Sequence, residues 1–152
     1  AASDVYKRQR FLTMIAVSTV LMYVLMYLNT WSWDHVYFSE TRAFAALYMG
    51  AVMAVVMLLF MWGMYRNRAA NYAILAGSAV VFAVALALLR SQATVGDVAW
   101  MRAMIPHHSI AILTSSRAHI TDPRVRSLAD GIITTQQREI GEMKSLIADL
   151  ER

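Results

Sequence analysis

The strongest chemical signal in the chain is a group of methionines and histidines in residues 100–112, which read WMRAMIPHHSIAI. At about 100° per residue, a helix brings within an arc of about 80° the side chains of Met101, Met104, His108, Ile112 and His119. His107 projects to the adjoining face, near Met104. Thioethers and imidazoles without a carboxylate suit Cu(I), or its analogue Ag(I), better than Mg²⁺, Ca²⁺ or Mn²⁺.

Pro106 lies inside this helix, where it crowds the carbonyl of Arg102 and predicts a kink before the two histidines. A second helical segment carries Gln136, Glu139 and Met143 on its otherwise apolar stripe. We expect Glu139 to fix the tautomer of a ligand histidine, and Met143 to add a thioether. The plainer alternative is that each of these side chains packs in an apolar core, as single histidines and methionines usually do.

Composition indicates a membrane portion joined to a polar portion. The chain is 59% hydrophobic and 16% charged, and the charges gather after residue 96. The net charge of +4 belongs to residues 1–96, since residues 97–152 hold seven basic and seven acidic side chains. Positive flanks of membrane helices explain this excess, so no nucleic-acid binding is expected. Cysteine is absent, which excludes disulfides, zinc–thiolate sites and thiol catalysis.

Three apolar runs predict a transmembrane domain over residues 11–90, with spans at 11–28, 43–65 and 72–89. Residues 1–10 are expected to form a tail; within it, residues 2–9 resemble translated sequencing adapter and carry no structural weight. Arginines before the first span and between the second and third predict a cytoplasmic N-terminus. We therefore expect a bacterial inner-membrane protein whose part after Arg90 lies in the periplasm.

Residues 91–96 are expected to link the membrane domain to a helical hairpin over 97–152. Asp97 is the predicted N-cap of a helix ending near Ile120, and Asp122-Pro123 starts a second helix that runs to about Leu150. The second helix is amphipathic, and one hairpin cannot bury such a stripe alone. The expected fold is all-α, with a half-bundle that a homodimer completes as a four-helix bundle.

The second span also carries a methionine every fourth residue, at Met49, Met53, Met57 and Met61. This spacing resembles the thioether ladder of copper-permeating helices. Methionine is also a flexible filler between packed helices, and we favour that interpretation.

The motif MIPHH at residues 104–108, with Ala111 and then Arg126, Leu128-Ala129, Ile132-Ile133, Gln136, Glu139-Ile140 and Met143, resembles the domain of unknown function 305 family over about residues 97–150. The resemblance implies a ferritin-like helical bundle and periplasmic copper or silver binding, with His107, His108, Met104 and Met143 as candidate ligands. Thr114 and Leu146 depart from the expected pattern, where the family has methionine and tryptophan. The first departure lowers the number of thioethers.

The predicted function is therefore a membrane-anchored, periplasm-facing protein that binds Cu(I), or Ag(I), in copper homeostasis or delivery. The predicted metal-site residues are His107, His108, Met104, Met143, Met101 and His119, with Glu139 and Gln136 supporting them. No organic cofactor and no enzyme activity are expected. The alternative is a non-metal scaffold or accessory subunit that oligomerises or docks on a membrane complex. A di-iron oxidase is disfavoured because the histidine-bearing helix has no glutamate.

Overall fold

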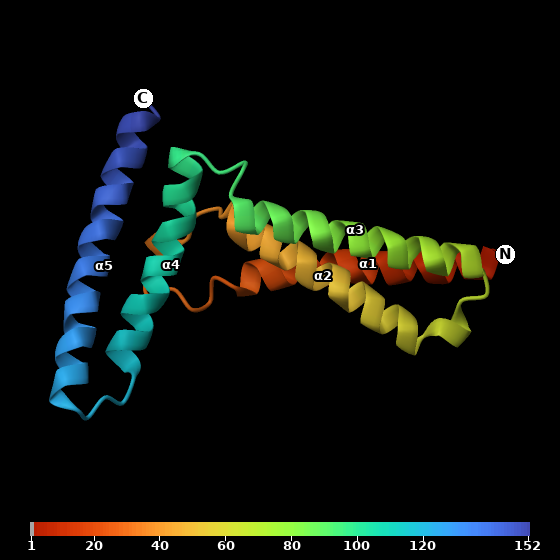
Figure 1. Cartoon of the computed structure of the whole chain (residues 1–152), viewed down its shortest axis with the longest axis horizontal. Coiled ribbons are helices and arrows are strands. Elements are labelled where there is room, and N and C mark those ends of the chain that lie inside the picture. The colour runs from red at the N-terminus through yellow and green to blue at the C-terminus, as the bar shows by residue number, and fades with distance from the viewer. Residues whose placement is uncertain (1) are drawn as a thin grey trace. The chain divides into compact units, whose positions relative to one another are not determined.

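The computed structural model describes residues 2–152, and within them it contains five α-helices, two short 3₁₀ turns and no strand (Figure 1). The α-helices are α1 (Ala2–Leu25), α2 (Glu40–Phe60), α3 (Arg68–Ser91), α4 (Asp97–Arg117) and α5 (Pro123–Leu150). The 3₁₀ turns are η1 (Trp33–His35) and η2 (Trp62–Met64). The predicted all-α class is confirmed.

The chain divides into two compact units, and the division differs from the predicted domains. One unit comprises residues up to Leu25 together with Thr41–Thr94. The other comprises Met26–Glu40 and Val95–Arg152. The connection between α1 and α2, expected as a membrane-interface loop, thus belongs with the C-terminal hairpin. We call Met26–Glu40 the strap.

Among the residues that the structure describes, two helices, rather than the predicted three, are long and apolar enough to cross a membrane. They are α2 and α3, each with a mean hydropathy of 2.4 over its best window. The first predicted span, 11–28, falls short because α1 already ends at Leu25. The part of α1 that follows Arg10 is about 22 Å long at 1.5 Å per residue, whereas the hydrocarbon core is about 30 Å thick.

In the first unit, α1 packs against α2 and α3 through a small apolar core. Phe11 and Leu58 are fully buried there beside Ala54 and Tyr65. Met57 and Met61 pack against the same cluster, which supports the packing interpretation of the methionine repeat. Gly50 lets α1 come close: a Cβ at this position would lie 2.3 Å from Thr19 Oγ1.

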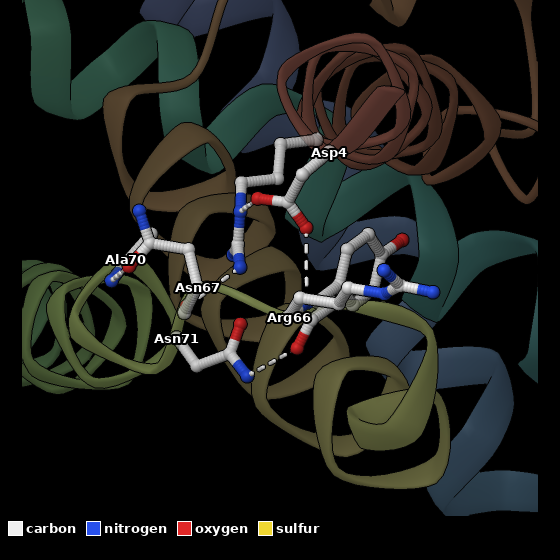
Figure 2. Close-up of polar contacts among 7 residues, drawn as sticks. Asp4, Arg66, Asn67, Ala70 and Asn71 are labelled. Atoms are coloured by element: carbon white, nitrogen blue, oxygen red, sulfur yellow. Dashed lines mark hydrogen bonds and ion pairs between the residues drawn. The ribbon is translucent and has the colours of Figure 1, made fainter. Parts of the chain in front are cut away.

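Polar contacts join the start of α1 to the turn before α3 (Figure 2). Arg8 pairs with Asp4 at 2.8 Å and donates to the carbonyl of Asn67 at 2.8 Å, while Asp4 accepts from the Arg66 backbone N–H. Asn67 caps α3 by accepting from the Ala70 N–H at 3.1 Å. Residues 2–10, expected as a tail, are therefore helical and belong to α1; Ala1 lies outside the described residues.

The second unit is built on the antiparallel pair of α4 and α5 (Figure 1). The predicted start of α5 is confirmed, since Asp122 is the N-cap, accepts from the Arg124 N–H at 2.8 Å and precedes Pro123. The seam between the helices buries Met101, Ile105, Ile112, Ile140, Met143 and Ile147. The predicted boundaries of α4 need correction: Gly96, not Asp97, is the N-cap, and α4 ends at Arg117.

Gly50 and Gly77 provide a matched test of α1–α2 packing. Gly50→Ala forces the Thr19 side chain to move, because Thr19 Oγ1, Cβ and Cγ2 all lie within 3.3 Å of the added carbon. We expect a destabilisation of about 1–3 kcal/mol, typical of overpacking, measured by thermal unfolding of the full chain in detergent. Gly77→Ala, with no atom within 4 Å, should not destabilise the protein. Adding Thr19→Ala should restore the Gly50→Ala variant; if it does not, the close contact is not the cause.

Candidate metal centre

A polar contact between His108 and Glu139 connects the two helices of the hairpin within their apolar seam. His108 is 8% exposed, and its Nε2 lies 2.6 Å from Glu139 Oε2. Its neighbours along α4, Ile105 and Ile112, are completely buried. The predicted role of Glu139 as the partner of a histidine on the first helix thus has a matching contact.

The other imidazole nitrogen of His108 has no hydrogen-bond partner among the described residues, although it is buried. When the imidazole is neutral and donates Nε2–H to the Glu139 carboxylate, its lone pair is on Nδ1. Buried polar atoms are normally satisfied, so an orphaned one needs an explanation. A deprotonated nitrogen held by a carboxylate on the opposite ring atom is the usual arrangement of a metal-ligating histidine.

Three methionines belong to the same seam. Met101 on α4 and Met143 on α5 are buried in its apolar cluster, and Met104 packs against this cluster while remaining half-buried. The two helices thus contribute thioethers to this core from both sides, and His108 lies on α4 between the core residues Ile105 and Ile112. Gln136, half-buried on α5, precedes Glu139 by about one turn.

The other two predicted histidines lie in different surroundings. His107 is exposed, with its ring centroid 6.5 Å from that of His108. His119 is also exposed, and it follows the end of α4. The helical spacing that placed His119 beside Met104 and His108 therefore does not apply, because that placement required the helix to continue to Ile120.

The donor atoms fit a soft metal ion better than a hard one. Within the described part of the chain, no three His, Asp or Glu side chains gather closely enough to hold a metal ion. A site for Cu(I) needs no such group, since thioethers and imidazole are sufficient ligands. His108, Met101, Met104 and Met143 would hold the ion.

Sequence reasoning missed the way the strap attaches to α4. Ser109, which is 0% exposed, accepts a hydrogen bond from the Trp31 backbone N–H at 2.6 Å. Its Oγ also lies 2.8 Å from His35 Nδ1. Ser109 directly follows His108, so the strap is fixed beside the candidate ligand. These contacts join residues more than 70 positions apart, and no periodicity in the sequence reports them.

Charge and aromatic contacts hold the rest of the strap. Lys144 on α5 forms an ion pair with Asp34, and this contact with the ammonium group keeps the pKa of Asp34 well below its usual value. Tyr27 donates to the carbonyl of Tyr37 at 2.6 Å, and Tyr37 packs against the hairpin core. Burial lowers the pKa of His35 below its ordinary value of 6.5, and nearby Asp34 opposes this shift only in part.

Because the pKa of His35 is lowered in the folded protein, we expect the strap to loosen in acid. Because the folded state depresses this pKa, the stabilisation is complete above pH 6.5 and is lost as the pH falls through the folded value. Exchange of the Trp31 amide, corrected for its intrinsic rate, should therefore accelerate between about pH 7.5 and pH 5.5. A His35→Asn variant should lack this acceleration; equal pH profiles for both proteins would contradict the assignment.

The family match to known proteins covers the hairpin region of the chain. The family described as a domain of unknown function, DUF305, matches residues 84–152. An uncharacterized protein of Acanthamoeba polyphaga mimivirus is 44% identical over 61 residues, which cover 39% of this chain and 40% of that protein. The chain thus spans less than half the length of this relative. No solved structure matches the chain. The C-terminal segment, residues 84–152, is therefore similar to the DUF305 family, as its motifs indicated.

Proposed function

We propose that this chain is a membrane-anchored protein that binds Cu(I), or Ag(I), in the periplasm of a bacterium and serves copper homeostasis or delivery. The observation that carries the proposal is the buried, partnerless Nδ1 of His108, whose ring Glu139 holds from the other side. The adjacent seam supplies the thioethers of Met101 and Met143, and Met104 lies at its edge. We propose a binding protein without enzyme activity or organic cofactor.

The exposed surfaces of α2 and α3 support a membrane anchor. The core helix of a soluble protein is mostly buried, whereas only 28% and 6% of the best apolar windows of α2 and α3 are buried. Large apolar side chains are exposed on α1 as well, among them Val17, Val20 and Val24. We propose that α2 and α3 cross the bilayer and that α1 lies with them.

Two crossings by α2 and α3 would put the strap and the hairpin on the same side, as their shared unit requires. Arg66 and Arg68, between α2 and α3, favour the cytoplasmic side for that turn. The strap and the hairpin would then face the periplasm of an inner-membrane protein. A cytoplasmic N-terminus further requires α1 to cross, which its short apolar stretch allows only with local thinning of the bilayer.

Single cysteines test this topology, because the natural chain has none. An impermeant maleimide added to intact cells should label Ser127→Cys on α5 and leave Arg66→Cys unlabelled until the cells are opened. Gln9→Cys should behave like Arg66→Cys if α1 crosses, and like Ser127→Cys if it does not. Labelling of Arg66→Cys in intact cells, with Ser127→Cys protected, would reverse the proposed orientation.

Metal binding is tested on the full chain in detergent by Cu(I) titration against a competing chelator. The variant His107→Ala/His108→Ala should lose tight binding. Met143→Leu should weaken binding while preserving the packed volume, because leucine and methionine are similar in size. Glu139→Gln should weaken binding by about 10–100-fold, the usual effect of removing the partner of a ligand histidine.

His119→Ala is the matched control, since His119 lies beyond α4 and should not affect Cu(I) affinity. The second candidate function, a metal-free scaffold, draws on the exposed apolar residues of α5, such as Leu128 and Leu150. It predicts no Cu(I) binding by the folded wild-type protein and normal assembly of the double histidine variant. That pair of results would refute the metal proposal.

We also propose that the hairpin acts as a homodimer in which two copies complete a ferritin-like four-helix bundle. Half-bundles with a broad apolar face require a partner to cover it.

A further inference from the structure

The two sides of the hairpin differ. One side is covered by the strap, which contacts Ser109 on α4 and Lys144 on α5. Arg102 and Glu151 pair on that same side, where they line a groove together with Tyr37 and Lys144. At about 100° per residue, Trp100 and His107 lie about 160–180° from Ser109 around α4. These two residues therefore mark the side that the strap leaves open.

The open side of α5 carries a regularly spaced apolar stripe. Leu128, Ile132, Leu146 and Leu150 are all exposed, with 65% exposure at Leu128 and 57% at Leu150. Glu139, half-buried, lies in the same stripe. The positions are symmetric about Glu139: Ile132 and Leu146 lie seven residues before and after it, and Leu128 and Leu150 lie eleven residues before and after it.

A surface with this symmetry is complementary to itself. In an isologous contact about a two-fold axis, a helix packs antiparallel on its own copy, and each residue meets the residue equally far from the axis. We propose that a second copy of this chain packs its α5 antiparallel on this stripe, with the two-fold axis at Glu139. Ile132 then packs on the partner's Leu146, and Leu128 on the partner's Leu150.

The same axis gives a compatible arrangement on α4. Because His108 bonds Glu139, both lie at the same level along the hairpin. An antiparallel α4 pair centred between His107 and His108 sets Met104 opposite the partner's Ala111, a large residue against a small one. Trp100, exposed near the start of α4, meets the partner's Ser115 near its end. Along the α4 pair, large side chains thus face small ones on both sides of the two-fold axis.

Charge favours a metal at this axis. The two Glu139 carboxylates, each bonded to the His108 of its own copy, come near each other there, and a cation bound nearby would offset their repulsion. On the rim, Arg138 comes beside the partner's Glu142, which is an opposite-charge pair. His107, which is exposed in one copy, comes beside the partner's His107 near the axis, one residue out of register. Resting on the proposed function, this arrangement makes the Cu(I) site one that the second copy completes.

Cysteine crosslinking of the metal-free full chain in detergent tests the register. A disulfide requires Cα atoms within about 7 Å. Glu139→Cys lies at the axis and should crosslink to its own copy on oxidation with diamide. Leu128→Cys alone should not crosslink, because the two copies of residue 128 lie about 33 Å apart at 1.5 Å per residue. Leu128→Cys combined with Leu150→Cys should crosslink efficiently.

Ser127→Cys with Leu150→Cys is the matched control, since Ser127 points away from the stripe and should crosslink poorly. Efficient crosslinking of Leu128→Cys alone would show a parallel pair and overturn the proposal. Absence of crosslinking in both Glu139→Cys and the Leu128/Leu150 double variant, with a monomeric mass for the wild type, would overturn the dimer itself.

A second pair of variants separates the shared site from the proposed function. Leu128→Arg should convert the dimer to a monomer and weaken Cu(I) binding by at least tenfold, while Ser127→Arg should change neither. A monomeric Leu128→Arg protein with wild-type Cu(I) affinity would overturn the shared site and leave the proposed function intact. A dimeric wild type that does not bind Cu(I) would refute the proposed function and leave the register intact.

Discussion

The contact between His108 and Glu139 is the constraint on which the arrangement of the hairpin depends. The seam around it is formed by isoleucine and methionine side chains, which could pack at several registers with similar energy. A single hydrogen-bonded polar pair limits this freedom, because any other register leaves the buried His108 ring without its carboxylate partner. The pair therefore fixes which methionines from α4 and α5 lie at the same level, and with them the set of possible metal ligands.

Much of the hairpin follows from local sequence rules. Asp122-Pro123 combines a side-chain cap with a proline that needs no N–H donor, and α5 begins where this pair predicts. The polar positions on an apolar stripe pointed to Glu139 as the partner of a histidine, and the contact is present. Periodicity and capping are properties of neighbouring residues, so one sequence is sufficient to read them.

The structure differs from the sequence-based predictions at places where tertiary packing determines the conformation. Leu25 ends α1 although the apolar run continues to Leu28, and His119 lies outside α4 although no residue between Thr114 and His119 forbids a helix. Where a helix ends depends on the path that the following segment takes in the fold as much as on local helix propensity. The attachment of the strap to the hairpin is the larger feature that the sequence did not predict. Its aromatic residues resembled a membrane-interface belt, whereas Trp31 and Tyr37 attach it to the hairpin through partners distant in sequence.

The strap also explains why one side of the hairpin is available and the other is not. Because strap residues contact Ser109 and Lys144, the strap covers that side of the hairpin and leaves the side that carries His107 open to a ligand or partner. The proposed metal ion and the proposed second copy would both bind at this surface. If both bind there, each must raise the affinity of the other by the same factor, because linkage between two binding equilibria is reciprocal. A metal that joins two copies in this way makes dimerisation depend on the supply of Cu(I), so the protein's assembly state would report the concentration of the ion it binds.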